Sequence, residues 1–362
     1  MKDVPEVTFP FTPPAPGEAV ELAEGVLWLR VPLQNFRPDH VNVYALDDGD
    51  GWTVIDTGLD SPRTREVWEM FLSGPLRGKP VRRVLVTHHH PDHVGLAGWL
   101  QAKGAEVWTT RTAWVTARML TLDEQDRPPP ETLAHWRRLG VPGEIIAERA
   151  AKRPFNFADC VSRLALGFRA IGQGQEIVAG GRRWRVEIGN GHAREHATLW
   201  GIGHEIVVTG DQVLPGITPN LGVQVSEPEA DPVGDWLASC RRLGALAGTD
   251  QLGLPGHRRP FLGLRARLAE LLEHGEIGLD RLEAFLSEPR RAADCFAVLY
   301  GRTIGSGEYL LALNEALGHL NRLTRAGRAV RESAPDGAWR WQAVAGAARR
   351  DELATDMPDA SR

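Results

Sequence analysis

The chain has 362 residues, which corresponds to about two domains at roughly 150 residues each. With 42 Lys and Arg against 47 Asp and Glu, its net charge of −5 argues against a chain built as a whole to coat nucleic acid or an anionic membrane. The three cysteines are too few and too widely spaced for a disulfide framework or a cysteine-based zinc site, and they fit a reducing compartment. They are Cys160, Cys240 and Cys295.

The beginning of the sequence carries no targeting pattern. Residues 1–17 are rich in proline and acidic residues and lack the apolar core and the small-residue cleavage site of a secretory signal. No run approaches the ~18 apolar residues that a membrane-spanning helix needs. We therefore expect a cytoplasmic protein that does not bind a membrane.

Short strands and helices alternate in the first hundred residues. Apolar, β-branched runs predict strands over residues 41–46, 52–55, 81–86 and 106–109. One helix begins at Ser61 and Pro62, which suit the N-cap and first position of a helix, and a second is predicted over 94–103. Strand, helix and strand joined by short connections are typical of an α/β fold.

The region from about 110 to 175 breaks this alternation and resembles a helical insertion. Helices are predicted over 112–120 and 131–139, with three prolines between them at 128–130. Further along, the sequence predicts strands over 183–188, 196–202, 205–208 and 251–254 and an amphipathic helix over 236–246.

The chain becomes mainly helical after residue 260. A leucine stripe predicts a helix over 308–324, followed by two short strands over 329–332 and 339–344. A helix followed by a β-hairpin is the ending of a winged-helix domain. We therefore predict a catalytic domain over 1–260, a helical, winged-helix-like domain over 261–346 and a flexible tail over 347–362.

The segment Thr87–His93, which reads THHHPDH, is the most informative part of the sequence. It lies between a predicted strand and a predicted helix, where ligand sites of α/β sheets collect. His88 and His90 are two residues apart and can point the same way, whereas Asp92 and His93 begin the next turn. One loop can thus serve two positions of a divalent cation such as zinc. The alternative is an incidental surface cluster in which Asp92 only caps a helix.

Three further polar residues each follow an apolar strand next to a glycine. They are His192, Asp211 and His257. Taken singly, each could be an ordinary loop residue, because glycine simply allows a sharp turn. Taken together with the histidine segment, they suggest one metal centre.

The order His88-x-His90-x-Asp92-His93, then His192, Asp211 and His257, resembles the metallo-β-lactamase-fold hydrolases. The resemblance covers about residues 20 to 260 and implies an α/β fold, an αββα sandwich with the site at one edge. It implies that His88, His90 and His192 hold one metal, that Asp92, His93 and His257 hold the other, and that Asp211 bridges them. The two ions would be Zn²⁺, with Mn²⁺ or Fe²⁺ as alternatives.

Other residues near the motif receive weaker assignments. Asp56, in the Ile55-Asp56-Thr57-Gly58 turn that the family also has, is expected to orient the ligands, with an ordinary turn residue as the alternative. His89 is expected to be exposed, and His196 has a smaller chance of contacting metal or substrate. The remaining histidines are expected at the surface or in packing: His40, His135, His204, His274 and His319.

The ligand pattern predicts a hydrolase that uses a metal-bridging hydroxide. Two close divalent ions can lower the pKa of a shared water from 15.7 toward ~7. Asp92 and Asp211 are the expected catalytic carboxylates, and Asp92 is placed to accept and return the proton of the water. The substrate is predicted to be an ester or thioester, with a small acyl-CoA-like molecule as the partner.

The basic end of the chain leaves alternatives open. Seven arginines lie between residues 321 and 350, and a subgroup of the family that includes an endoribonuclease and thioesterases carries a similar C-terminal module. The arginines could follow RNA, so a ribonuclease or phosphodiesterase is the main alternative. A lactonase and a metal-loaded regulator without turnover are weaker ones, and a homodimer stays open. Apolar residues of the insertion are candidates for an acyl pocket: Trp114, Met119, Trp136, Phe155 and Phe157.

Overall fold

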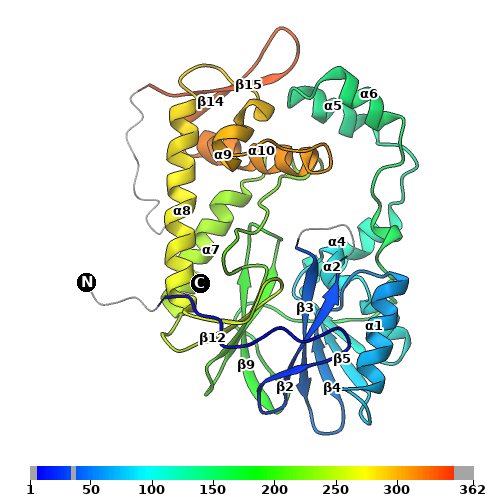
Figure 1. Ribbon diagram of the computed structural model, residues 1–362. Coiled ribbons are helices and arrows are strands. Elements are labelled where there is room, and N and C mark those ends of the chain that lie inside the picture. Colours follow the sequence, from blue (N-terminus) through cyan, green and yellow to red (C-terminus); the bar gives the residue numbers. More distant parts are fainter. Residues whose placement is uncertain (1–5, 34–37, 346–362) are drawn as a thin grey trace, which may run out of the picture.

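The computed structural model describes residues 6–33 and 38–345, which form two β-sheets packed face to face (Figure 1). The first sheet holds, in spatial order, β1 (Val20–Ala23), β2 (Val26–Pro32), β3 (His40–Asp47), β4 (Trp52–Ile55), β5 (Val81–Leu85), β6 (Glu106–Thr109) and β7 (Arg169–Ala170). The second sheet holds β13 (Phe261–Leu262), β12 (Leu252–Pro255), β11 (Ile206–Gly210), β10 (His196–Gly201), β9 (Arg182–Gly189) and β8 (Glu176–Ala179).

Helices cover the outer face of each sheet. The first sheet carries α1 (Pro62–Ser73), α2 (Pro91–Val94), α3 (Ala97–Ala102) and α4 (Arg111–Leu122). The second sheet is covered by α7 (Pro232–Leu246) and α8 (Leu264–Phe285). The predicted four-layer α/β architecture is therefore confirmed.

Strand β3 shows how the sequence produces these layers. Val41 and Val43 point outward into the cluster beneath α1 and α3, whereas Tyr44 and Leu46 point into the core between the sheets. Alternate side chains of a strand lie on opposite faces, and both faces of β3 are buried. This explains why the middle of β3, residues 43–46, is apolar at every position instead of alternating with polar residues.

The segment that resembles an insertion divides between two parts of the molecule. Helix α4 and the η1 turn (Phe157–Asp159) stay with the first sheet, and Ala117 and Val161 are buried in its outer cluster. Helices α5 (Pro130–Arg138) and α6 (Gly143–Ala150) instead pack with the C-terminal helices, where Trp136 and Ile146 join their buried cluster. Arg149 Nη2 also donates to the Ser306 carbonyl at 2.7 Å.

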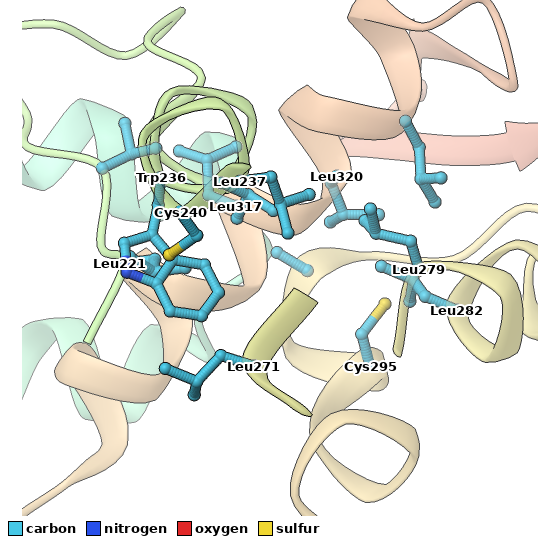
Figure 2. Close-up of a cluster of buried hydrophobic side chains, with 14 of the residues drawn as sticks. Leu221, Trp236, Leu237, Cys240, Leu271, Leu279, Leu282, Cys295, Leu317 and Leu320 are labelled. Carbon is cyan, nitrogen blue, oxygen red and sulfur yellow. The ribbon is translucent and has the colours of Figure 1, made fainter. Parts of the chain in front are cut away.

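The C-terminal part packs against α7 and α8 in one shared hydrophobic core. It consists of η2 (Ala292–Cys295), α9 (Phe296–Tyr300), α10 (Tyr309–Arg325), β14 (Ala329–Ser333) and β15 (Trp339–Ala343). Figure 2 shows its centre, where Leu317 and Leu320 of α10 approach Leu237 and Trp236 of α7. The predicted tail over residues 347–362 lies outside the described residues. Within the described ranges, none of the helices is long and apolar enough to cross a membrane.

Candidate metal centre

Four of the predicted ligands lie at the end of the first sheet. His88 and His90 follow β5, and His90 is the N-cap of α2, whose first residue is Pro91. Asp92 and His93 are therefore held in the first turn of a helix, while His88 and His90 remain in the extended segment before it. The single loop presents its ligands in two directions, as the spacing predicts.

The other three predicted ligands come from the second sheet. His192 lies between β9 and β10, and Asp211 and His257 follow β11 and β12. Because β11 and β12 are parallel, Asp211 and His257 leave the sheet at the same edge. Gly256 allows this close approach, since a Cβ there would lie only 2.2 Å from Asp211 Oδ1.

Three imidazole nitrogens converge at the first subsite. His88 Nε2 and His90 Nδ1 are 3.0 Å apart, His90 Nδ1 and His192 Nε2 are 3.0 Å apart, and His192 Nε2 and His88 Nε2 are 3.3 Å apart. Tetrahedral zinc at ~2.0–2.1 Å from nitrogen places its ligands about 3.3 Å from one another. The three residues therefore fit a zinc ion in spacing and in donor type.

A second triad lies beside the first and shares Asp211 with it. His257 Nε2 is 3.2 Å and His93 Nε2 is 3.6 Å from Asp92 Oδ2. Asp211 Oδ2 lies 3.2 Å from His257 Nε2, 3.4 Å from His93 Nε2 and 3.5 Å from His192 Nε2. The buried His93 Nε2 and Asp211 Oδ1 have no hydrogen-bond partner. A divalent ion would satisfy such polar atoms, so this donor set also fits a metal.

Asp56 orients ligands on the first-sheet side. Its Oδ2 lies 2.8 Å from His93 Nδ1, and its carboxylate also accepts the backbone N–H and the hydroxyl of Thr87. Thr87 Oγ1 in turn lies 2.9 Å from His88 Nδ1. A bond at Nδ1 leaves Nε2 with its lone pair facing the site. Asp56 adopts a φ of 60°, a conformation that few residues other than glycine adopt without a compensating interaction.

Backbone carbonyls orient the other ring ligands. His192 Nδ1 donates to the Asn220 carbonyl at 2.9 Å, and His257 Nδ1 donates to the His40 carbonyl at 2.7 Å. Each ring is thus fixed in the tautomer whose Nε2 can bind a metal. His40, which the sequence placed among surface or packing residues, adjoins the centre through its own backbone.

Strand β3 holds the turn that carries His257. The Asn42 side-chain amide donates to the carbonyls of Pro255 and Arg258 at 2.8 and 3.0 Å, and the Tyr44 hydroxyl donates to Pro255 at 2.8 Å. Trp28 Nε1 completes the set by donating to Asn42 Oδ1. These residues were not predicted as part of the site, although a lone Asn at position 42 inside an apolar strand was a signal for them.

Two other histidines lie beside the centre without belonging to its ligand groups. His196 is fully buried, stacks on His88 with ring centroids 4.6 Å apart, and accepts the Asp211 backbone N–H at Nε2. It therefore supports Asp211 and belongs to none of the metal-competent groups. The prediction that His89 is exposed is wrong, because the residue is half-buried and its buried Nδ1 has no hydrogen-bond partner.

The two subsites differ in their electrostatics. Burial and the neighbouring His93 hold the pKa of His88 well below its usual value, and burial with His192 does the same for His90, so both rings are neutral at pH 7. Burial would lower the pKa of His257, but the facing Asp211 raises it to about 10. The carboxylates Asp92 and Asp211 thus concentrate negative charge at the second triad, which suits a divalent cation.

The apolar candidates for an acyl pocket do not gather in one place. Trp114 stacks on Phe168 with ring centroids 4.6 Å apart, and Trp136 is buried with the C-terminal helices. Met119 and Phe155 are exposed, at 53% and 60% of their surface. The prediction that these residues form one pocket wall is therefore not supported by their positions.

Comparison with known proteins identifies the family. A model described as Metallo-beta-lactamase superfamily matches residues 36–252, and one described as Metallo-beta-lactamase-like, C-terminal domain matches residues 279–344. The chain is similar to the probable metallo-hydrolase YqjP of Bacillus subtilis, with 26% identity over 306 residues that cover 83% of this chain and 92% of that protein.

Two more relatives extend the comparison. A beta-lactamase domain protein from Burkholderia ambifaria, of known crystal structure, has 35% identity and a TM-score of 0.81, covering 93% of this chain and 98% of that chain. Hydroxyacylglutathione hydrolase of Xylella fastidiosa has 24% identity over 216 residues, which are 59% of this chain and 58% of that protein. Because the first family model alone spans more than half of the chain, the protein belongs to the metallo-beta-lactamase superfamily and is a hydrolase of that superfamily.

Proposed function

We propose that this hydrolase cleaves an ester or thioester, such as an acyl-CoA-like molecule, at a dinuclear metal centre. The observation that carries the proposal is the position of Asp211. Its Oδ2 lies 3.2–3.5 Å from ring nitrogens of both triads, His257 and His93 on one side and His192 on the other. One carboxylate between two ligand sets suits two ions that share it.

Two divalent ions, for which the histidine-rich donor set favours zinc over Mn²⁺ or Fe²⁺, would supply an activated water and polarise a carbonyl oxygen. The chain itself supplies the proton acceptor. The Asp92 side chain is 21% exposed, against 7% for Asp211, and the neighbouring His93 and His257 oppose the effect of burial and lower the pKa of its carboxyl. Asp92 is thus an ionised carboxylate within reach of a substrate, whereas Asp211 is held at the back of the site.

The arginines of the C-terminal part favour a small substrate over RNA. The described arginines of this segment are engaged within the chain: Arg322 with Asp231, Arg325 with the Glu229 carbonyl, Arg328 with Asp280 and Glu283, Arg331 with Glu229, and Arg340 with Asp336. Internal partners of this kind neutralise the field that would attract a phosphate backbone. The hydroxyacylglutathione hydrolase relative, a thioester hydrolase by its name, points in the same direction.

Nuclease activity, lactonase activity and a regulator without turnover are alternative functions that the experiment below distinguishes. The order of α10, β14 and β15 fits the winged-helix-like module that we propose for the C-terminal part, and such a module could still bring RNA to the centre. A lactonase, a regulator without turnover and a homodimer are distinguished by the same panel, run with a sizing column.

The test measures metal content and turnover on the full chain. The purified wild type is analysed for bound metal and assayed with esters, thioesters, lactones and a phosphodiester, beside Asp211→Ala, Asp92→Asn and the exposed control Asp50→Asn. We expect two ions and thioester turnover in the wild type and the control. Asp211→Ala should lose metal, and Asp92→Asn should keep metal but lose about 100-fold or more in rate, since a general base is typically worth 10²–10⁴.

Two results would contradict the proposal. Turnover of the phosphodiester alone, together with binding of single-stranded RNA at low salt, would make the protein a nuclease. Full activity and full metal content in Asp92→Asn would remove the role assigned to this carboxylate.

A further inference from the structure

Helix α10 of the C-terminal part touches the segment that follows Asp211. Val223 N–H donates to the Asn314 carbonyl at 3.0 Å, and Asn220 Nδ2 donates to Glu315 Oε2 at 3.1 Å. Gly318 lets the helix come close, because a Cβ there would lie 2.5 Å from the Leu221 carbonyl oxygen. Figure 2 shows Leu221 itself inside the buried cluster near Trp236.

The same segment reaches the metal centre. The Asn220 carbonyl accepts His192 Nδ1 at 2.9 Å, and His192 Nε2 faces His88 and His90 in the first subsite. Asn220 therefore links the two residues: its side-chain amide contacts Glu315, which is far away in sequence, and its backbone carbonyl contacts His192.

Tyr300 lies beside Glu315, at the end of this link that is farther from the metal centre. Its hydroxyl lies 3.0 Å from both Glu315 Oε2 and the Ala312 carbonyl oxygen, and burial together with the Glu315 carboxylate raises the pKa of the phenol, which therefore keeps its proton. Glu315 Oε2 thus accepts the Asn220 amide and also lies within hydrogen-bond distance of the hydroxyl that Tyr300 shares between Glu315 and Ala312. Turning the carboxylate away from Asn220 would therefore also separate it from Tyr300.

We propose that Glu315 is a positioning residue for the metal ligand His192 and acts through Asn220, so that the C-terminal helix α10 completes the metal centre. The inference rests on the proposed function only in needing a metal at His88, His90 and His192. The segment is also fixed by Leu221 and by Arg267, which donates to the Leu214 and Ile217 carbonyls. Removing the Glu315 carboxylate should therefore leave the segment folded but free the Asn220 peptide to rotate.

The test compares metal affinities in the full chain. Stepwise Co²⁺ titration with a competing chelator gives one affinity for each ion, and the d–d absorption of Co²⁺ reports the ligand geometry. Loss of a residue that orients a ligand typically weakens metal binding by 10–100-fold. We expect Glu315→Ala to weaken the three-histidine subsite by about tenfold, at the lower end because Glu315 acts through Asn220, and to shift its spectrum.

Controls separate positioning from general stability. Glu315→Gln retains an oxygen that accepts the Asn220 amide and should restore near-wild-type affinity. Glu308→Ala, at the exposed start of the same helix, should change neither affinity. Asn220→Ala should match Glu315→Ala, and the double variant should be no weaker than either single one, because both changes break the same hydrogen bond.

Wild-type affinities for both ions in Glu315→Ala, or additive effects in the double variant, would overturn the inference. If Glu315→Ala does not fold, Asn220→Ala in the folded chain decides the question by the same criterion. A wild type that binds no metal would overturn the proposed function as well, whereas a wild type that binds two ions with an unaffected Glu315→Ala overturns the inference alone.

Discussion

Gly256→Ala tests whether Asp211 must occupy its present position between the triads. A Cβ at residue 256 would lie 2.2 Å from Asp211 Oδ1 and 2.7 Å from His93 Cε1, against 3.4 Å or more for an ordinary contact. The carboxylate would have to retreat by about 1 Å, and a displacement of this size at a reacting site costs roughly 100-fold in rate. Overpacking of the buried site would add about 1–3 kcal/mol of destabilisation.

The assay pairs this variant with another Gly→Ala change. Gly278 lies inside α8, where a Cβ would meet nothing within 4 Å. Gly278→Ala should keep metal and turnover and raise the free energy of unfolding by about 0.5–1 kcal/mol, because alanine is the better helix former. We expect Gly256→Ala to lose at least one ion and most of the turnover. Two ions and wild-type turnover in Gly256→Ala would refute the reasoning, since Asp211 would then tolerate displacement.

Two further predictions follow from the contacts. Asp56→Asn replaces the acceptor of His93 Nδ1 and should weaken metal binding by about 10–100-fold in a chelator competition; unchanged affinity would show that Asp56 is only a turn residue. Burial raises the pKa of Cys160, Cys240 and Cys295 to about 12 each, so at pH 8 the reactive thiolate is depleted about 1000-fold relative to a free thiol. Thiol reagents should label the native chain that much more slowly and the denatured chain at three sites, whereas fast native labelling would contradict the burial.

Local sequence patterns predicted most strands and helices of the sandwich. They failed where tertiary contacts determine the bounds of an element. The strands over 52–55 and 106–109 have the predicted bounds. The predicted helix over 94–103 is instead two helices, α2 and α3, with the chain broken at Gly95 and Leu96. A Cβ on Gly95 would lie 2.4 Å from the Gly58 carbonyl oxygen, and Leu96 N–H bonds to Gly58 and Thr57. The hydrophobic periodicity of the sequence cannot predict such a backbone contact.

The hairpin of β1 and β2 was missed although its signal is in the sequence. Residues 26–32 read VLWLRVP and are apolar at most positions, and Glu24-Gly25 is a turn signal before them. The seven proposed ligands could be chosen because their spacing is fixed by the ends of strands. Their supports could not, because Asn42 and Asn220 act through hydrogen bonds to residues far away in the sequence.

The basic end of the chain shows why local charge is a poor guide to a partner. Exposed ion pairs such as Arg340–Asp336 are screened by solvent and contribute little to stability. Arg322 differs, because its partner Asp231 is buried, with a side chain 5% exposed, and also accepts the Gly234 N–H as the N-cap of α7. This arginine of α10 therefore binds the segment that leads from Asp211 to α7. Arg325 and Arg331 likewise bind Glu229, so these three arginines fasten the C-terminal part to the segment before α7, whereas Arg328 pairs with α8 and Arg340 pairs within the β14–β15 hairpin.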